Sequence, residues 1–195
     1  MPQTQPIPKA QAGRGSSRGI GSVTVLSLDI TIVTNNNGSY TDTMSEAKAQ
    51  EKVLTSLKAT GCKTQKFTDQ FGFGIADLLA GITGLSIWIE MKYRKSWPVK
   101  PTTPLLTLGS NGISGNQVFW LGEWWMRSAA TCVLLAFGDG SWLLVPGLYA
   151  SRLTEIPSRA WKPLLQTTPL TRLSIHTIMQ ALKQAQTYLE DLPNG

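Results

Sequence analysis

The stretch GIADLLAGITGLSIWIEMK, residues 74–92, holds two β-prone segments one after the other. Residues 85–93 are the best strand candidate in the chain, since isoleucine, aromatic and other apolar residues dominate them. Residues 75–81 form a shorter β-like segment just before. We therefore expect two consecutive strands here, with the rest of the fold arranged around them.

Charged residues stand at regular positions on the second of these strands. Successive side chains of a strand point to opposite faces of the sheet. Ile87 and Ile89 are therefore expected on one face, and Trp88, Glu90 and Lys92 are expected on the other. Burying a carboxylate and an ammonium among core residues is costly unless the charges pair or bind a metal ion. This face of the strand is the first candidate for a functional site.

Three helices and three further strands are expected around this stretch. The first helix begins at Ser45, whose side chain can cap it, and ends at Gly61. Asp139-Gly140, a dipeptide typical of hairpin turns, joins the last two strands, and residues 148–173 are expected to be irregular. The other elements are expected as strands at 63–67, 131–138 and 141–147 and as helices at 116–129 and 174–190. This order predicts an α/β fold with a small mixed central sheet flanked by helices.

The composition along the chain divides it into four segments. Residues 1–21, rich in Pro, Gln, Gly and Ser with a few basic residues, are expected to form a flexible basic arm. Residues 22–44 are interpreted as a β-prone N-terminal appendage. Residues 45–147 contain the predicted core, and residues 148–195 form a C-terminal extension with the terminal helix.

The overall composition is typical of a soluble globular protein, with 42% hydrophobic and 15% charged residues. The 195 residues suffice for one domain with a sizeable core. No apolar run reaches the roughly eighteen residues expected of a membrane-spanning helix, and the N-terminus lacks the apolar segment of a signal peptide. We therefore expect an intracellular protein without a membrane partner. The formal net charge of +6 attracts polyanions such as nucleic acid.

Histidine and cysteine are scarce in this chain. It has one histidine, His176, and two distant cysteines, Cys62 and Cys132. A zinc site needs about four ligands, so no zinc site is expected. Both cysteines are expected to be free thiols of an intracellular protein. His176 lies beside the apolar stripe of the last predicted helix and is expected at or near the surface.

Asp77 adds a second carboxylate close to the charged strand. Two carboxylates can hold a divalent metal ion, usually Mg²⁺, which prefers oxygen ligands and for which Mn²⁺ can substitute. Such an ion lowers the pKa of bound water and neutralises charge on a phosphate, and a nearby lysine can position the attacking water. This combination of residues is what hydrolysis of a phosphodiester bond requires, although the same spacing also arises by chance.

Each residue of this pattern has an expected role. Asp77 is interpreted as a bridging residue and Glu90 as a direct metal ligand. The backbone carbonyl of Met91 is expected to supply a further ligand, and Lys92 to orient the water.

Further motifs follow one another between residue 45 and about residue 138. They are Glu46, Gln50 and Gly61 on the first helix, then Gly74-Ile75-Ala76-Asp77, Glu90-Met91-Lys92, Gln117 with Trp120 and Leu121, and the strand at 131–137. In this order they resemble the virus-type replication–repair nucleases and, more loosely, the archaeal Holliday-junction resolvases, both of the PD-(D/E)xK superfamily. Ala76 departs from the pattern, because the family usually has proline there.

The resemblance implies a restriction-endonuclease-like core and a Mg²⁺-dependent endonuclease whose partner is DNA. Its target would be branched DNA, as for a junction resolvase, or a specific duplex site, as for a homing endonuclease. The resemblance also implies a homodimer or a larger homo-oligomer and is compatible with a viral or phage source. Two alternatives are a non-catalytic nucleic-acid-binding protein on a decayed nuclease fold and a viral structural protein in which the pattern is accidental.

Two carboxylates compete for the helix position of this motif. Glu46 shares a helical face with Gln50 and the apolar Val53 and Leu57, whereas Glu51 lies at the margin of that face. We therefore expect Glu46 to act as an outer ligand of the metal ion or as a ligand of a second ion.

Polar and basic residues outside the central pattern are expected to contact the substrate. Gln117 is expected to bind phosphate or to orient Lys92, and a purely structural role fits equally well. Arg94, Lys95 and Lys100 are expected to contact DNA phosphates that flank the cut.

The remaining aromatic and basic residues leave alternatives open. Trp97 can stack on bases or anchor its loop, and the Trp120 helix can belong to the core or to a dimer interface. Arg159 and Arg172 either extend a basic surface or are separate solvated charges.

Overall fold

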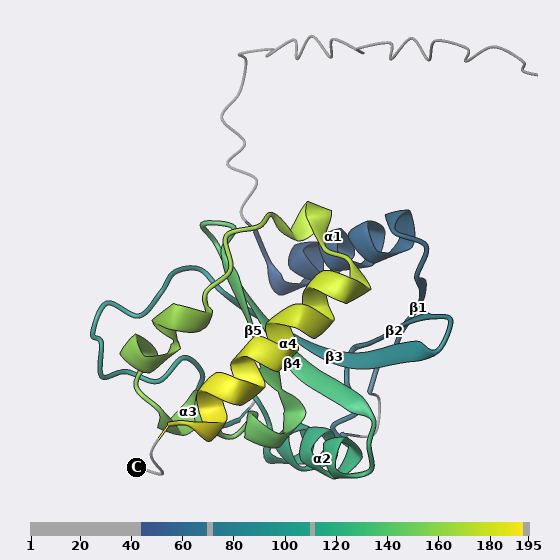
Figure 1. Ribbon diagram of the computed structural model, residues 1–195. Helices are drawn as coiled ribbons and strands as arrows, with labels where there is room; N and C mark the ends of the chain where they lie inside the picture. Colours follow the sequence, from purple (N-terminus) through teal and green to yellow (C-terminus); the bar gives the residue numbers. More distant parts are fainter. Residues whose placement is uncertain (1–43, 70–71, 110–111, 193–195) are drawn as a thin grey trace, which may run out of the picture. The chain divides into compact units, whose positions relative to one another are not determined.

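The computed structural model describes residues 44–69, 72–109 and 112–192 (Figure 1). The predicted basic arm and nearly all of the predicted β-prone appendage fall within residues 1–43, outside the described part of the chain. The described residues belong to a single unit.

Five strands form one mixed sheet in the order β1-β2-β3-β4-β5. Neighbouring strands are antiparallel except for β3 and β4, which run parallel because a helix connects them. The strands are β1 (Lys63–Lys66), β2 (Leu78–Ile82), β3 (Leu85–Arg94), β4 (Ala130–Phe137) and β5 (Trp142–Pro146).

Four α-helices of the described residues accompany the sheet, and the predicted ends of the first one are confirmed. The Ser45 side chain accepts a hydrogen bond from the Lys48 N–H (3.3 Å) at its start. Gly61 follows its end with a φ of +85°, which suits glycine. The helices are α1 (Glu46–Ala59), α2 (Gly115–Met126), α3 (Arg152–Glu155) and α4 (Ile175–Glu190). The α/β class, the mixed sheet and its flanking helices are therefore as predicted.

The region at 148–173 is more regular than expected. It contains α3 and three short 3₁₀-helices, η1 (Gly147–Tyr149), η2 (Ser158–Leu164) and η3 (Leu170–Arg172). A proline stands just before each 3₁₀-helix, with φ between −57° and −54°. Proline fixes φ near the helical value, so each one favours a turn of helix directly after it.

Different elements pack on the two faces of the sheet. α1 and α4 pack on one face, where α4 crosses in front of the strands in Figure 1. On the other face, α2 and the segment around η1 and η2 pack mainly over β4 and β5. The predicted alternation along β3 is confirmed, since Ile87 and Ile89 belong to the first core and Trp88 to the second.

The C-terminal segment is built into this core. Ile178 and Leu182 of α4 are buried in the same cluster as Leu78 and Ile87 of the sheet. Both cysteines are buried free thiols, as expected. Within the described residues, no helix combines the length and the apolar character needed to cross a membrane.

Candidate active site

The site lies where β2 ends and β3 continues alone. The last residue pair between these strands is Leu78 with Ile89. Beyond it, the Met91 N–H donates to Asp77 Oδ2 (2.8 Å) instead of to a strand. The Tyr93 N–H likewise hydrogen-bonds the Glu46 carboxylate. Two carboxylates therefore occupy the edge of β3 that β2 leaves open.

The loop before Asp77 is fixed by a third carboxylate. Asp69 accepts hydrogen bonds from the N–H groups of Phe73 (3.1 Å) and Gly74 (2.5 Å). Asn116 at the start of α2 donates to the Gly72 carbonyl (2.7 Å). Gly74 has a φ of +80°, and a Cβ there would lie 2.3 Å from the Asn116 carbonyl carbon. This close approach ties the position of Asp77 to that of α2.

Glu90 is the most buried charged residue among those that the structure describes, with 0% exposure. Its Oε1 atom accepts from Gln117 Nε2 (2.5 Å) and lies 3.0 Å from Lys92 Nζ. Its Oε2 atom is buried without any hydrogen-bond partner. An unpaired buried carboxylate oxygen is costly in a folded protein and is a feature that a bound cation would remove.

Gln117 holds Glu90 through both ends of its amide. Its Oε1 accepts from the Ser114 N–H (2.9 Å), while the Ser114 hydroxyl accepts from the Gln117 N–H (3.1 Å). This capping box fixes the side chain in the first turn of α2. The amide therefore orients Glu90 rather than contacting Lys92 directly, and Lys92 is oriented by the same carboxylate oxygen.

Burial raises the pKa values of the three carboxyl groups. The pKa of Glu90 is raised to about 8, chiefly by burial and also by the charges of Asp77 and Glu46, against the opposing effect of Lys92. Burial raises the pKa of Asp77 against the opposing effects of the Met91 N–H, Lys92 and Lys66. Burial also raises the pKa of Glu46, opposed by Lys92. The cluster thus has more negative charge than its neighbouring cations offset.

The oxygen atoms of this cluster fit a hard divalent cation. N–H and C=O groups of one strand residue point to the same side, so the Met91 carbonyl is directed to the same open edge as Asp77. Within the described residues, no three Asp, Glu, His or Cys side chains are already grouped as a metal site. A cation here would therefore rely on Asp77, Glu90 and a ligand from the backbone.

Glu46, rather than Glu51, faces this cluster. The charge of Glu46 interacts with Lys92 and Asp77, while Glu51 is exposed on α1. Gln50, Val53 and Leu57 are buried as predicted. Glu46 itself is exposed, because it lies in the first turn of α1, at the end of the buried stripe.

The basic residues predicted for DNA contact fall into two groups. Arg94 is half-buried, and its guanidinium donates to the carbonyls of Leu105 and Pro104, which braces the loop after β3. Lys95 and Lys100 are exposed. Trp97 anchors its loop by packing on Phe137, with the ring centroids 5.1 Å apart. The structure therefore gives Arg94 a bracing role within the protein.

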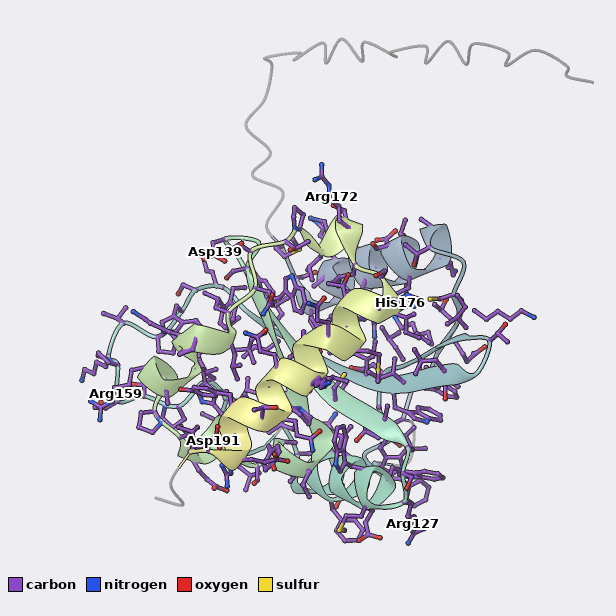
Figure 2. The ribbon with its side chains drawn as sticks, viewed as in Figure 1. Arg127, Asp139, Arg159, Arg172, His176 and Asp191 are labelled. Atoms are coloured by element: carbon purple, nitrogen blue, oxygen red, sulfur yellow. The ribbon has the colours of Figure 1, made fainter. Side chains whose placement is uncertain are left out.

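Arg159, Arg172 and His176 lie on the surface, away from the site. Figure 2 shows Arg159 and Arg172 well apart, so they do not form one basic patch. His176 is exposed at the start of α4, as predicted (Figure 2).

Three residues that contribute to the site were missed in the sequence. Lys66 interacts electrostatically with Asp77, and Asp69 and Asn116 hold the loop that leads to Asp77. A lysine at the end of the predicted strand 63–67 was a visible signal. No sequence pattern connects Asp69 or Asn116 to that loop, because their contacts depend on how α2 docks.

Comparisons with known proteins give little beyond this geometry. No protein-family model matches the chain, and no curated protein matches it. A solved structure, the Holliday junction resolvase Hjc of Archaeoglobus fulgidus, an archaeal hyperthermophile, is similar at 22% identity. The similarity covers 52% of this chain and 72% of that one, with a TM-score of 0.38. At so low a score, the function has to be argued from the residues of the site.

Replacing Gly74 tests whether its close approach to α2 positions Asp77. Gly72→Ala is the matched control, because Gly72 also has a positive φ (+70°) but open space around it. The control is expected to cost about 1–2 kcal/mol of unfolding free energy. Gly74→Ala is expected to cost roughly 1–3 kcal/mol more, because of the clash with Asn116. Urea denaturation measures both, and equal losses would contradict this account of the loop.

Replacing Glu90 tests the raised pKa in the metal-free protein. A folded-state pKa of about 8, above the ordinary 4.5, means that the folded state favours the protonated carboxyl. The stability from this preference is fully present below about pH 4.5 and is lost as pH rises to about 8. Relative to wild type, Glu90→Gln should therefore gain stability between pH 5 and pH 8, on the order of a few kcal/mol.

Urea denaturation in EDTA at several pH values measures this difference. Asp139→Asn is the control, because hydrogen bonds from Ser141 lower the pKa of Asp139 and place its titration below this range. The difference in unfolding free energy between Asp139→Asn and wild type should stay constant between pH 5 and pH 8. A constant difference for Glu90→Gln as well would show that Glu90 ionises normally in the fold.

Proposed function

We propose that this protein is a metal-dependent endonuclease that hydrolyses phosphodiester bonds of DNA. The observation that carries the proposal is the buried Glu90 carboxylate, which has one oxygen paired with Lys92 and Gln117 and the other without a partner. Asp77 and Glu46 add negative charge at the same place. A purely structural cluster would gain from pairing these charges internally, whereas this one is left with excess negative charge.

Mg²⁺ is the cation that we propose for this site, with Mn²⁺ able to replace it. Asp77, Glu90 and the Met91 carbonyl would hold it, with Glu46 as an outer ligand. When bound, such an ion lowers the pKa of a coordinated water and neutralises charge on the scissile phosphate.

The side chains of the protein position the remaining groups. The Lys92 ammonium is only 12% exposed and lies 3.0 Å from Glu90, so it can donate to a water or a phosphate oxygen beside that carboxylate. Gln117 keeps Glu90 in place, which fixes Lys92 in turn. Attack of water on phosphorus breaks one P–O ester bond and leaves a phosphate monoester and a hydroxyl group.

DNA is the substrate that the charge of the surroundings supports. Lys95 and Lys100 are exposed after β3 and can contact phosphates next to the cut. Branched DNA and specific duplex sites are both targets that the sequence resemblance suggests. The resemblance also implies self-association, which stays a prediction. Two apolar side chains on α2 are available for such a contact, since Phe119 is 70% exposed and Met126 is 64% exposed.

Replacing Lys92 tests the proposed reaction. Lys92→Ala should lower kcat by about a hundredfold or more, because a charge that stabilises the transition state is lost. Lys95→Ala is the matched control: it should weaken binding and reduce its salt dependence while leaving kcat at saturating DNA unchanged. Cleavage should require Mg²⁺ or Mn²⁺ and stop in EDTA.

The assay uses supercoiled plasmid, linear duplex, single strand and a four-way junction. The form that is cleaved fastest identifies the target. Binding without cleavage of any form would instead indicate a non-catalytic nucleic-acid-binding protein. Equal losses of kcat in Lys92→Ala and Lys95→Ala would remove Lys92 from its proposed role.

A further inference from the structure

The second face of the sheet is only partly covered, because α2 and the segment around η1 and η2 pack mainly over β4 and β5. On β2, Leu78 and Ala80 are buried under α1 and α4, while Leu79 and Gly81 are half-buried. β3 repeats this pattern, since its Ile87 is buried and its neighbours are not. We call the less covered side the open face; it consists of Lys63, Gln65, Leu79, Gly81, Ser86 and Trp88, of which Trp88 lies at the border with α2 and contacts Trp120.

The strand register shows that these residues form two rows across the sheet. Gln65 lies opposite Leu79, which lies opposite Trp88. Lys63 lies opposite Gly81, which lies opposite Ser86. A hollow of about 810 Å³ is lined by five of these six residues together with the β2–β3 turn. Apart from Trp88, the residues of the open face therefore lie in a depression of the surface.

The open face borders the candidate active site. Ser86, Trp88, Glu90 and Lys92 follow one another at every second position of β3, so they project from the same face. Trp88 also contacts the rings of Phe67 and of Trp120 on α2, with centroid distances of 5.1 Å and 5.3 Å, and all three side chains are half-buried. A molecule lying on the open face would reach Glu90 only past this group of rings.

The chemistry of the open face selects among possible occupants. Lys63 is exposed at one end and Lys92 lies at the other, and none of the six residues is acidic. Between them the floor is apolar and aromatic, with Leu79 and Trp88. Cations suit a phosphate backbone, and aromatic rings suit the faces of unpaired bases. A DNA duplex keeps its base faces stacked inside and cannot offer them to this floor.

We propose that the open face binds an unpaired strand of nucleic acid and leads it to Glu90 and Lys92. This inference rests on the proposed nuclease function for its purpose, but binding can be measured without cleavage. The substrate would then be DNA with unpaired nucleotides next to the cut. Lys63 has an alternative explanation, because lysines on an edge strand such as β1 prevent pairing with the edge strand of another molecule. The test therefore changes the charge at a position that is not on β1.

Gly81 allows such a test in the middle of the open face. A Cβ at this position would meet only the Leu85 carbonyl oxygen at 3.5 Å and the Ser86 Cβ at 3.7 Å, which are ordinary contacts. Gly81→Glu and Gly81→Lys are therefore matched variants that differ chiefly in charge. Thermal melting should show that both remain folded.

Binding is measured in EDTA by fluorescence anisotropy with labelled oligothymidylate and with a blunt duplex of equal length. Gly81→Glu should weaken binding of the single strand by about tenfold, while Gly81→Lys should keep or strengthen it. Binding of the duplex should change much less in either variant. Oligouridylate and polyphosphate serve as further probes, to separate DNA from RNA and from charge alone.

Several outcomes would overturn the proposal. They are equal effects of the two Gly81 variants, equal effects on duplex and single strand, or polyphosphate binding that follows the same pattern. If the wild-type protein cleaves no form of DNA but its single-strand binding still depends on the charge at residue 81, the nuclease function is refuted and the open face remains a binding site. If the wild-type protein cleaves DNA but Gly81→Glu binds the single strand as well as wild type does, the nuclease function stands and the role of the open face is refuted.

Discussion

Strand alternation forces the Glu90 carboxyl into the interior, opposite the first turn of α2, where its side chain is about 1% exposed. Water cannot solvate the charge there, so neighbouring groups must offset a large desolvation cost. Gln117 and Lys92 do so at one carboxylate oxygen, and the capping box of α2 fixes Gln117. The other oxygen stays unpaired. The first turn of α2 and the Lys92 side chain are thus both positioned by their contacts with the Glu90 carboxylate.

The early end of β2 supplies the other carboxylates. Because β2 pairs with β3 only as far as Leu78, the N–H groups of Met91 and Tyr93 have no strand partner. Asp77 and Glu46 accept these hydrogen bonds. Satisfying two backbone donors in this way gathers negative charge around Glu90, and the charges of Asp77 and Glu46 make ionisation of Glu90 less favourable. The carboxylate cluster therefore forms where the pairing between β2 and β3 ends.

Local signals in the sequence predicted much of this arrangement. Ser45 and Gly61 marked the ends of α1 because capping depends on adjacent residues, and the period of two along β3 separated Ile89 from Glu90. Ser114 followed by Gln117 was a local signal too, and it could have shown that Gln117 is held in a capping box. Its contact with Glu90, 27 residues earlier, depends on how α2 docks. The hydrogen bonds of Arg94 to Leu105 and Pro104 were not foreseen for the same reason, since the folded-back loop that accepts them has no signature in the sequence.

The two faces of β2 and β3 differ in how far they are buried. Ile87 and Ile89, fully buried against α1 and α4, contribute hydrophobic stabilisation on one side. Leu79 on the other side is half-buried and Ser86 is exposed, so substitutions there remove less buried area. The side of β3 that packs on α1 and α4 holds the strand in place. The same strand thereby fixes Glu90 and Lys92, and with them the charged pair beside the edge that β2 leaves open.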